Sequence, residues 1–149
     1  MRSYGLCCIV FVLFMTSLSL ARDVAVITDK ANASSTVSSK DLLKYLKAET
    51  ARWPDGRKVT VYLSDPASSD GKLLLEKTYK MTPFELKTFA QGQNGNIVIL
   101  GSDDLVLKAV AANPGAIGVV NVYSINSAIK VLKVDGKLPL ERGYLLHGN

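Results

Sequence analysis

Chemically reactive side chains are scarce in this sequence of 149 residues, which contains two cysteines and one histidine. Cys7 and Cys8 both lie in the first 21 residues, which we expect to be removed. The remaining chain then has no thiol for a disulfide, a thiolate metal site or a nucleophile. His147 lies near the end of the sequence with no catalytic or metal-ligand pattern around it. We therefore expect no enzyme, no metal and no other cofactor, and an incidental His147 in a disordered tail.

Strong charge of one sign is also absent. The sequence has 18 lysines and arginines against 13 aspartates and glutamates, for a formal net charge of +5. These charges are interspersed, and the sequence has neither a basic arm nor a stripe of stacking aromatics, so nucleic acid is not an expected partner. A mild positive excess is compatible with a small anionic ligand and equally with ordinary solubility.

The first 21 residues have the pattern of a secretory signal peptide. Arg2 supplies a positive start, residues 6–15 are almost wholly apolar, and Ser19 and Ala21 are small residues at the expected cleavage site. The apolar run is shorter than the ~20 residues of a membrane span. We expect a signal peptide at 1–21, one domain at 22–149, a periplasmic or secreted location and no stable membrane span after cleavage. An uncleaved anchor is the alternative.

Predicted strands and helices alternate along residues 22–149. Short apolar runs predict strands at 23–28, 58–63, 96–100, 116–122 and 129–134. Capping residues predict helices that begin after Ser38, Ser68 or Ser69, Thr82 and Ser102. This alternation predicts an α/β fold: an open mixed sheet of about five strands with helices on both faces. In such sheets ligands bind beyond the carboxyl ends of the strands.

Several details of packing follow from the same patterns. We expect the first helix to reach about Glu49, Trp53 to cover the end of the core, and the residues from 137 onward to carry no clear period. Gly118 lies inside a predicted strand, where it would let a backbone or a ligand come close. The helix after Ser102 is expected to bury Leu105, Val106, Ala109 and Val110.

Residues 64–79 suggest a ligand site. A run rich in Ser, Asp, Pro and Gly leads directly into a helix with an apolar stripe, which gathers backbone N–H groups and the hydroxyls of Ser68 and Ser69. The first N–H groups of a helix lack partners within it, and the helix dipole favours an anion there. Spacing alone favours the simpler interpretation that Ser68 or Ser69 caps the helix.

The segment 113–118, Asn-Pro-Gly-Ala-Ile-Gly, continues as Val-Val-Asn-Val-Tyr-Ser. It resembles a run in the substrate-binding proteins of phosphate ABC transporters, which are class II periplasmic binding proteins. Earlier segments match in order and spacing: Val-Ala-Val-Ile at 24–27, the helix after Ser38, Trp-Pro-Asp-Gly at 53–56, a strand and a serine-rich helix start. The resemblance covers most of residues 23–134 and implies one lobe of such a protein, its second lobe with the hinge strand.

The resemblance also implies a phosphate site at the serine-rich helix start. Where the family has Ser-Gly-Thr, this sequence has Ser68, Ser69 and Asp70, of which only Ser68 is identical. We predict a ligand site formed by Ser68, Ser69, Asp70, Gly71 and Lys72, with the N–H groups of residues 70–72 as donors. A carboxylate at Asp70 repels a dianion unless it accepts a hydrogen bond from a protonated oxygen. Lys72 is the nearest cation.

The sequence is compatible with two functions. The first is a secreted, non-catalytic solute-binding domain for inorganic phosphate or a similar small oxyanion, linked to phosphate uptake or sensing. Its candidate partners are an ABC permease and a second copy in a homodimer. The alternative is a ligand-free protein-interaction or dimerisation module on the same fold, which Asp70 and the absence of a matched first lobe favour.

Overall fold

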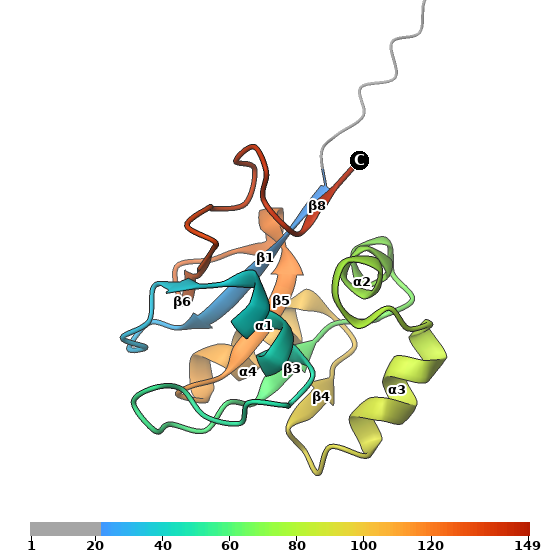
Figure 1. Ribbon diagram of the computed structural model, residues 1–149, viewed down its shortest axis with the longest axis horizontal. Coiled ribbons are helices and arrows are strands. Elements are labelled where there is room, and N and C mark those ends of the chain that lie inside the picture. The colour runs from blue at the N-terminus through green and yellow to red at the C-terminus, as the bar shows by residue number, and fades with distance from the viewer. Residues whose placement is uncertain (1–21) are drawn as a thin grey trace, which may run out of the picture.

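The computed structural model describes residues 22–149, so the signal peptide predicted at 1–21 lies outside the described residues. Three strands are parallel to one another: β3 (Val61–Leu63), β4 (Ile97–Ile99) and β5 (Ile117–Asn121). Strand β1 (Arg22–Asp29) is antiparallel to β5, and β6 (Ile129–Val131) and β8 (His147–Gly148) are antiparallel to β1. The sheet order is β4-β3-β5-β1-β6, with β8 beside the start of β1 (Figure 1). The predicted open mixed sheet is confirmed, with six strands.

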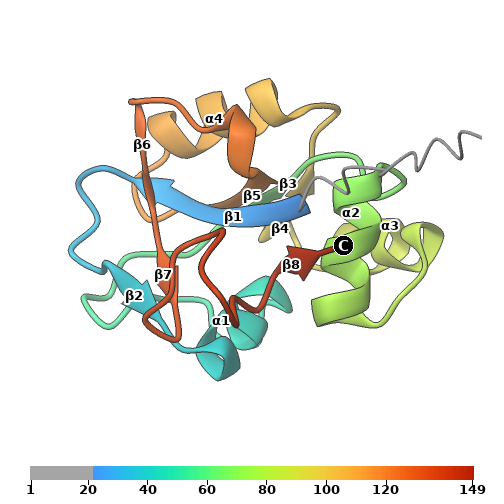
Figure 2. The ribbon, with the colours of Figure 1, turned by 90° about the horizontal axis from the view of Figure 1, so that it is seen from above.

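Helices cover both faces of the sheet, as predicted (Figure 2). Helix α4 (Asp103–Ala112) covers one face, and α1 (Ser39–Leu46), α2 (Ser69–Leu74), the π-helix η1 (Leu75–Tyr79) and α3 (Pro83–Gln91) cover the other. Strand β1 supplies both cores because successive side chains of a strand point to opposite faces. Val24 and Val26 belong to the larger cluster, whereas Ala25 and Ile27 belong to the cluster under α4.

The helices begin at the predicted capping residues. Ser38 Oγ accepts the N–H of Asp41 at 3.1 Å, and Ser102 Oγ accepts the N–H of Leu105 at 3.3 Å. Thr82 and Glu85 form a reciprocal capping box with Pro83 as the first residue of α3. These side chains satisfy N–H groups that have no partner within the helix. Helix α1 ends at Leu46 rather than near Glu49, because the chain turns at Ala48, whose φ is 57°.

Trp53 covers the end of the core, as predicted, and is 4% exposed. Its ring centroid lies 4.9 Å from that of Tyr45, and its Nε1–H donates to the carbonyl of Gly115 at 2.7 Å. A buried indole N–H needs such an acceptor. Trp53 therefore ties the turn before β3 to the turn before β5.

The last predicted strand, 129–134, is divided in two. Strand β6 ends at Val131, and β7 (Lys133–Val134) pairs in parallel with β2 (Thr36–Val37) in a separate two-stranded sheet. The division falls at Leu132, which is fully buried and whose N–H bonds to the carbonyl of Val26 at 2.9 Å. The chain thus passes from the main sheet at β6 to the small sheet at β7, and the core continues through Leu132.

Two packing predictions are wrong. The tail is ordered rather than disordered, with Tyr144 and Leu146 buried and His147 in β8. Its apolar residues are too few to produce a recognisable period. Leu105 is 47% exposed, because α4 buries Val106, Leu107 and Val110 instead. The buried face is turned slightly around the helix from the predicted one.

Within residues 22–149 no helix combines the length and the apolar character that crossing a membrane requires.

Gly118 is a close-packed position, but side chains come close there rather than the backbone or ligand that we predicted. A Cβ there would lie 2.7 Å from Val110 Cγ2 and 2.8 Å from Val106 Cγ1, so α4 packs directly on this backbone. We expect Gly118→Ala to lower the free energy of unfolding by about 1–3 kcal/mol in urea titrations, because branched side chains must move. Gly101→Ala is the control, since its Cβ would meet no atom within 4 Å. Equal stability of the two variants would contradict this account of the packing.

Candidate anion site

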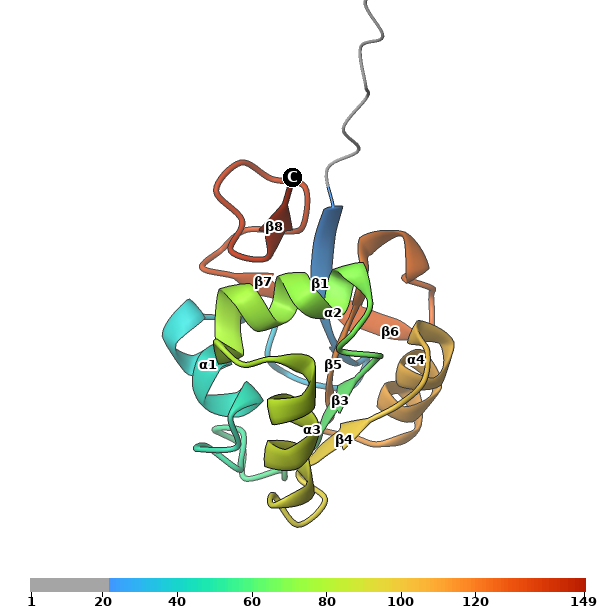
Figure 3. The same cartoon turned by 90° about the vertical axis from the view of Figure 1, so that its right-hand side faces the viewer.

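The predicted site lies at the carboxyl edge of the parallel strands. Strands β3, β4 and β5 lead from this edge into α2, α4 and the 3-10 helix η2 (Val122–Ser124), and Figure 3 shows α2 and α4 flanking the sheet. Because β1 is antiparallel to β5, with Val24 opposite Asn121, the start of β1 lies at the same edge. Ligands of open α/β sheets bind beyond this edge.

The start of α2 shows which predicted donors are already used. Ser68 Oγ accepts the N–H of Gly71 at 3.0 Å and donates to the carbonyl of Asp65 at 2.7 Å. The N–H of Lys72 bonds to the carbonyl of Ser68 at 2.9 Å. Ser68 is therefore the helix cap that spacing alone favoured. Among the described residues, the N–H groups of Ser69 and Asp70 have no partner, and they remain available to a ligand.

Asp70 ties α2 to the end of β5. Its Oδ2 accepts the side-chain N–H of Asn121 at 3.0 Å, while its Oδ1 is buried and has no partner within the described chain. The backbone N–H of Asn121 and the hydroxyl of Ser124 both donate to Asp103 Oδ2, at 3.0 and 2.7 Å. Two carboxylates thus connect α2, α4 and β5. Sequence reasoning did not identify Asn121, Asp103 and Ser124, although their positions at or shortly after strand ends are a usable signal.

A cavity beside Asp70 is too small for phosphate. It has a volume of about 10 Å³, and Ser64 and Asp70 line it together with mainly apolar side chains. A space of this size holds about one water molecule. An oxyanion therefore does not fit in this cavity.

The outer side of α2 opens onto a larger depression with positive charge. Its volume is about 310 Å³, and the residues that line it are Arg22, Ser69, Lys72, Leu73, Glu76, Gly148 and Asn149. Ser69, Lys72, Leu73 and Glu76 share one helical face because they are three or four residues apart. Of the five predicted site residues, Ser69 and Lys72 line this depression. Sequence reasoning did not include Arg22, Gly148 and Asn149, which tertiary pairing alone brings to α2.

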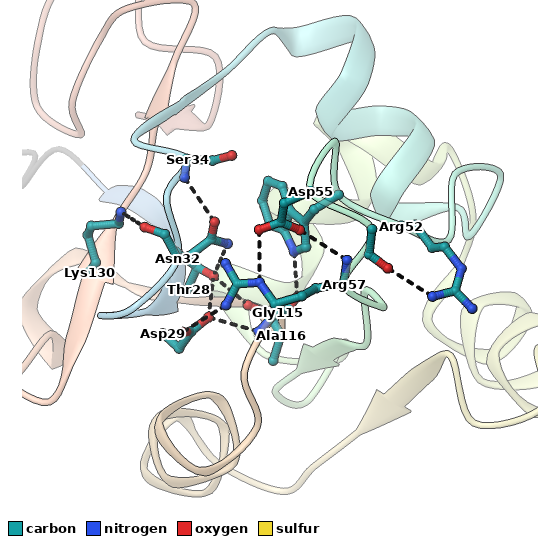
Figure 4. A network of polar contacts seen from close by, with 12 residues as sticks. Thr28, Asp29, Asn32, Ser34, Arg52, Asp55, Arg57, Gly115, Ala116 and Lys130 are labelled. Atoms are coloured by element: carbon teal, nitrogen blue, oxygen red, sulfur yellow. Dashed lines mark hydrogen bonds and ion pairs between the residues drawn. The ribbon is translucent and has the colours of Figure 1, made fainter.

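A second polar network lies at the opposite edge, where β1 ends and β5 begins (Figure 4). Asp29 is buried; its Oδ1 accepts the N–H of Gly115 at 2.9 Å, and its Oδ2 lies 3.7 Å from Arg57 Nη1. The backbone N–H of Arg57, and then its guanidinium, hold the pKa of Asp55 below its usual value. This network fixes the turn at 113–115 and lies away from the α2 depression.

No group of three or more histidine, cysteine, aspartate or glutamate side chains suited to a metal ion occurs within the part of the chain that the structure describes.

No protein-family model and no curated protein sequence matches the chain. Solved structures do. An ABC-type phosphate transport receptor from Vibrio cholerae matches with a TM-score of 0.70 and 14% identity, over 85% of this chain and 54% of its own. PstS from Borrelia burgdorferi matches with a TM-score of 0.68 and 19% identity, over 87% and 55%. A phosphate-binding protein from Stenotrophomonas maltophilia matches with a TM-score of 0.62 and 21% identity, over 81% and 41%.

The similarity to these structures shows the class of fold. The mixed α/β sheet of this chain is that of one lobe of a periplasmic binding protein. More narrowly, it is the fold of the substrate-binding proteins of phosphate ABC transporters, which confirms the resemblance inferred from the sequence. The chain spans about half the length of these solved structures.

Gly71 has a packing role that the sequence did not reveal. A Cβ there would lie 2.3 Å from the carbonyl oxygen of Asp65 and 2.6 Å from Pro66 Cα, both of them backbone atoms. We expect Gly71→Ala to lower the free energy of unfolding by about 1–3 kcal/mol, because the loop before α2 must move. Gly92→Ala, whose Cβ would make only an ordinary contact at 3.5 Å, is the control. Urea titration of both variants checks this, and an unaffected Gly71→Ala would contradict it.

Proposed function

We propose that this chain is a non-catalytic solute-binding domain for phosphate or a similar small oxyanion. The observation that carries the proposal is the depression where Arg22 from β1 meets Ser69 and Lys72 from α2. Two cations and a hydroxyl line this depression, and the N–H groups of Ser69 and Asp70 at the adjoining start of α2 have no partner in residues 22–149. All of these groups can donate to an oxyanion. The structural neighbours, named as phosphate receptors and phosphate-binding proteins, support the same ligand class.

The two cations have different roles in this proposal. A guanidinium can form two parallel hydrogen bonds with an oxyanion, so Arg22 provides orientation, whereas the ammonium of Lys72 is a point charge. Glu76 lines the same depression and opposes an anion. The depression lies at the surface and leaves much of a small ligand in water, so we expect modest affinity.

The cellular role extends the same proposal. We place the domain in the periplasm or outside the cell, after loss of the predicted signal peptide at 1–21, where it serves phosphate uptake or sensing. An ABC permease is the proposed partner. The solved neighbour from Vibrio cholerae supports the transport role, since it is named as an ABC-type phosphate transport receptor.

Titration calorimetry with phosphate, sulfate and acetate tests the ligand. We expect phosphate to bind with a Kd of about 1 mM or tighter. Lys72→Gln should weaken binding about tenfold, because a hydrogen bond to a charged group contributes roughly 1.5–3 kcal/mol. Lys77→Gln is the matched control, since Lys77 is exposed on the following π-helix and does not line the depression. Absence of heat with all three anions would refute the proposal.

Asp70 should limit affinity for fully charged anions. Asp70→Asn removes its charge and leaves an oxygen to accept from Asn121. We expect the Kd for phosphate and sulfate to fall severalfold, since a unit charge a few ångströms away contributes about 1 kcal/mol in water. Asp104→Asn, on the exposed start of α4, is the control. Weaker phosphate binding in Asp70→Asn would contradict this expectation.

A ligand-free interaction or dimerisation module is the second candidate. Leu105 and Tyr123 favour it, because they are 47% and 70% exposed and lie on α4 and η2, which Asp103 joins at the carboxyl edge. A contiguous patch of exposed apolar side chains can mark an interaction surface, and these two residues would contribute to such a patch. Light scattering and the anion titrations distinguish the two functions. A dimer that Leu105→Ser and Tyr123→Ser abolish, in a protein that gives no heat with any of the three anions, would favour this function over solute binding.

A further inference from the structure

Asp23 connects the start of β1 to the tail of the chain. The side chain is fully buried. Its Oδ1 lies 2.6 Å from Nδ1 of His147, and its Oδ2 accepts the N–H of Leu140. Since a carboxylate can only accept, Nδ1 of His147 carries the hydrogen. Both oxygens of one buried carboxylate are thus satisfied by residues more than 110 positions away in the sequence.

Further contacts hold the tail on β1. Arg22 pairs with Gly148 and Asp23 with His147 in the antiparallel ladder of β1 and β8. The hydroxyl of Tyr144 donates to the carbonyl of Val24 at 2.8 Å. Burial, and then the negative charge of Asp23, raise the pKa of Tyr144, so its hydroxyl stays protonated and remains a donor. The tail is therefore part of the fold.

The end of the tail also touches α2. A Cβ on Gly148 would lie 2.8 Å from Leu73 Cδ2 and 2.8 Å from the carbonyl oxygen of Arg22, so Gly148 fits closely between β1 and α2. Figure 2 shows β8 beside β1 with the end of the chain next to α2. Gly148 and Asn149 line the same depression as Ser69 and Lys72. The tail is one wall of the proposed anion site.

We infer that the contact between Asp23 and His147 positions this site: it seats β8 between β1 and α2 and so sets where Arg22, Ser69 and Lys72 stand around a small oxyanion. The ligand in this inference rests on the proposed function, whereas the positioning of α2 by the tail does not. In this inference His147 is a positioning residue rather than the incidental residue that the sequence led us to expect.

Three variants of the protein test the inference. His147→Ala removes the contact from a side chain that is 47% exposed, so the core stays intact. His147→Asn keeps a donor close to the position of Nδ1 and should restore the contact. Arg142→Ala changes an exposed residue of the same tail and is the matched control.

Amide hydrogen exchange and amide chemical shifts report position without any ligand. In His147→Ala we expect the amides of Val24 and Leu140 to exchange about tenfold faster, because a hydrogen bond to a buried charge is lost. The amide resonances of Ser69 and Lys72 should shift. The Kd for inorganic phosphate should rise about threefold to tenfold, because the arrangement of Arg22, Ser69 and Lys72 that binds phosphate is populated less. His147→Asn and Arg142→Ala should resemble the wild type in all three measurements.

The outcomes separate the two claims. Unchanged exchange, or faster exchange with unmoved Ser69 and Lys72 resonances, would overturn the inference. Unchanged phosphate affinity in His147→Ala, when the wild type binds phosphate, would overturn it as well. If the wild type binds no phosphate, the proposed function fails, and the resonances of Ser69 and Lys72 still decide whether the tail positions α2.

Discussion

The burial of strand β1, with a carboxylate near each end, is the constraint on which the rest of the structure depends. All residues from 23 to 29 are buried, and their alternation supplies both cores of the sheet. A buried carboxylate is costly unless hydrogen-bond donors surround it. Asp23 takes donors from the tail, and Asp29 takes the N–H of Gly115 with Arg57 nearby. One strand thus fixes the tail at one edge and the turn before β5 at the other.

The direction of β1 also determines where the charges of the depression meet. Because β1 runs antiparallel to β5, its first residue lies at the carboxyl edge of the parallel strands, where α2 begins. Arg22 therefore reaches the same depression as Ser69 and Lys72. On the inner side of α2 the carboxylate of Asp70 is held by Asn121. The fold thus brings two positive side chains and the serine at the start of α2 together without a dedicated loop.

Local chemistry made much of the fold predictable. Apolar runs gave the strands, and Ser38, Thr82 and Ser102 marked helix starts because each satisfies an N–H group within its own turn. The ordered tail, the division at Leu132 and the partners of Asp70 depend on tertiary pairing, which no short window of sequence contains. For the site, sequence identified Ser69 and Lys72 but could not show that Ser68 and the amides of residues 71 and 72 are used internally. The five-residue site itself stays a prediction.

The central claim is that a small oxyanion binds on the outer side of α2, between β1 and the tail. An NMR titration of the isotopically labelled protein with phosphate tests it most directly, because every backbone amide reports separately. The account predicts that the amides of Ser69 and Asp70, which have no partner among the described residues, shift most, together with those of Lys72 and Gly148. Saturable shifts elsewhere on the surface, with these four amides unmoved, would contradict it.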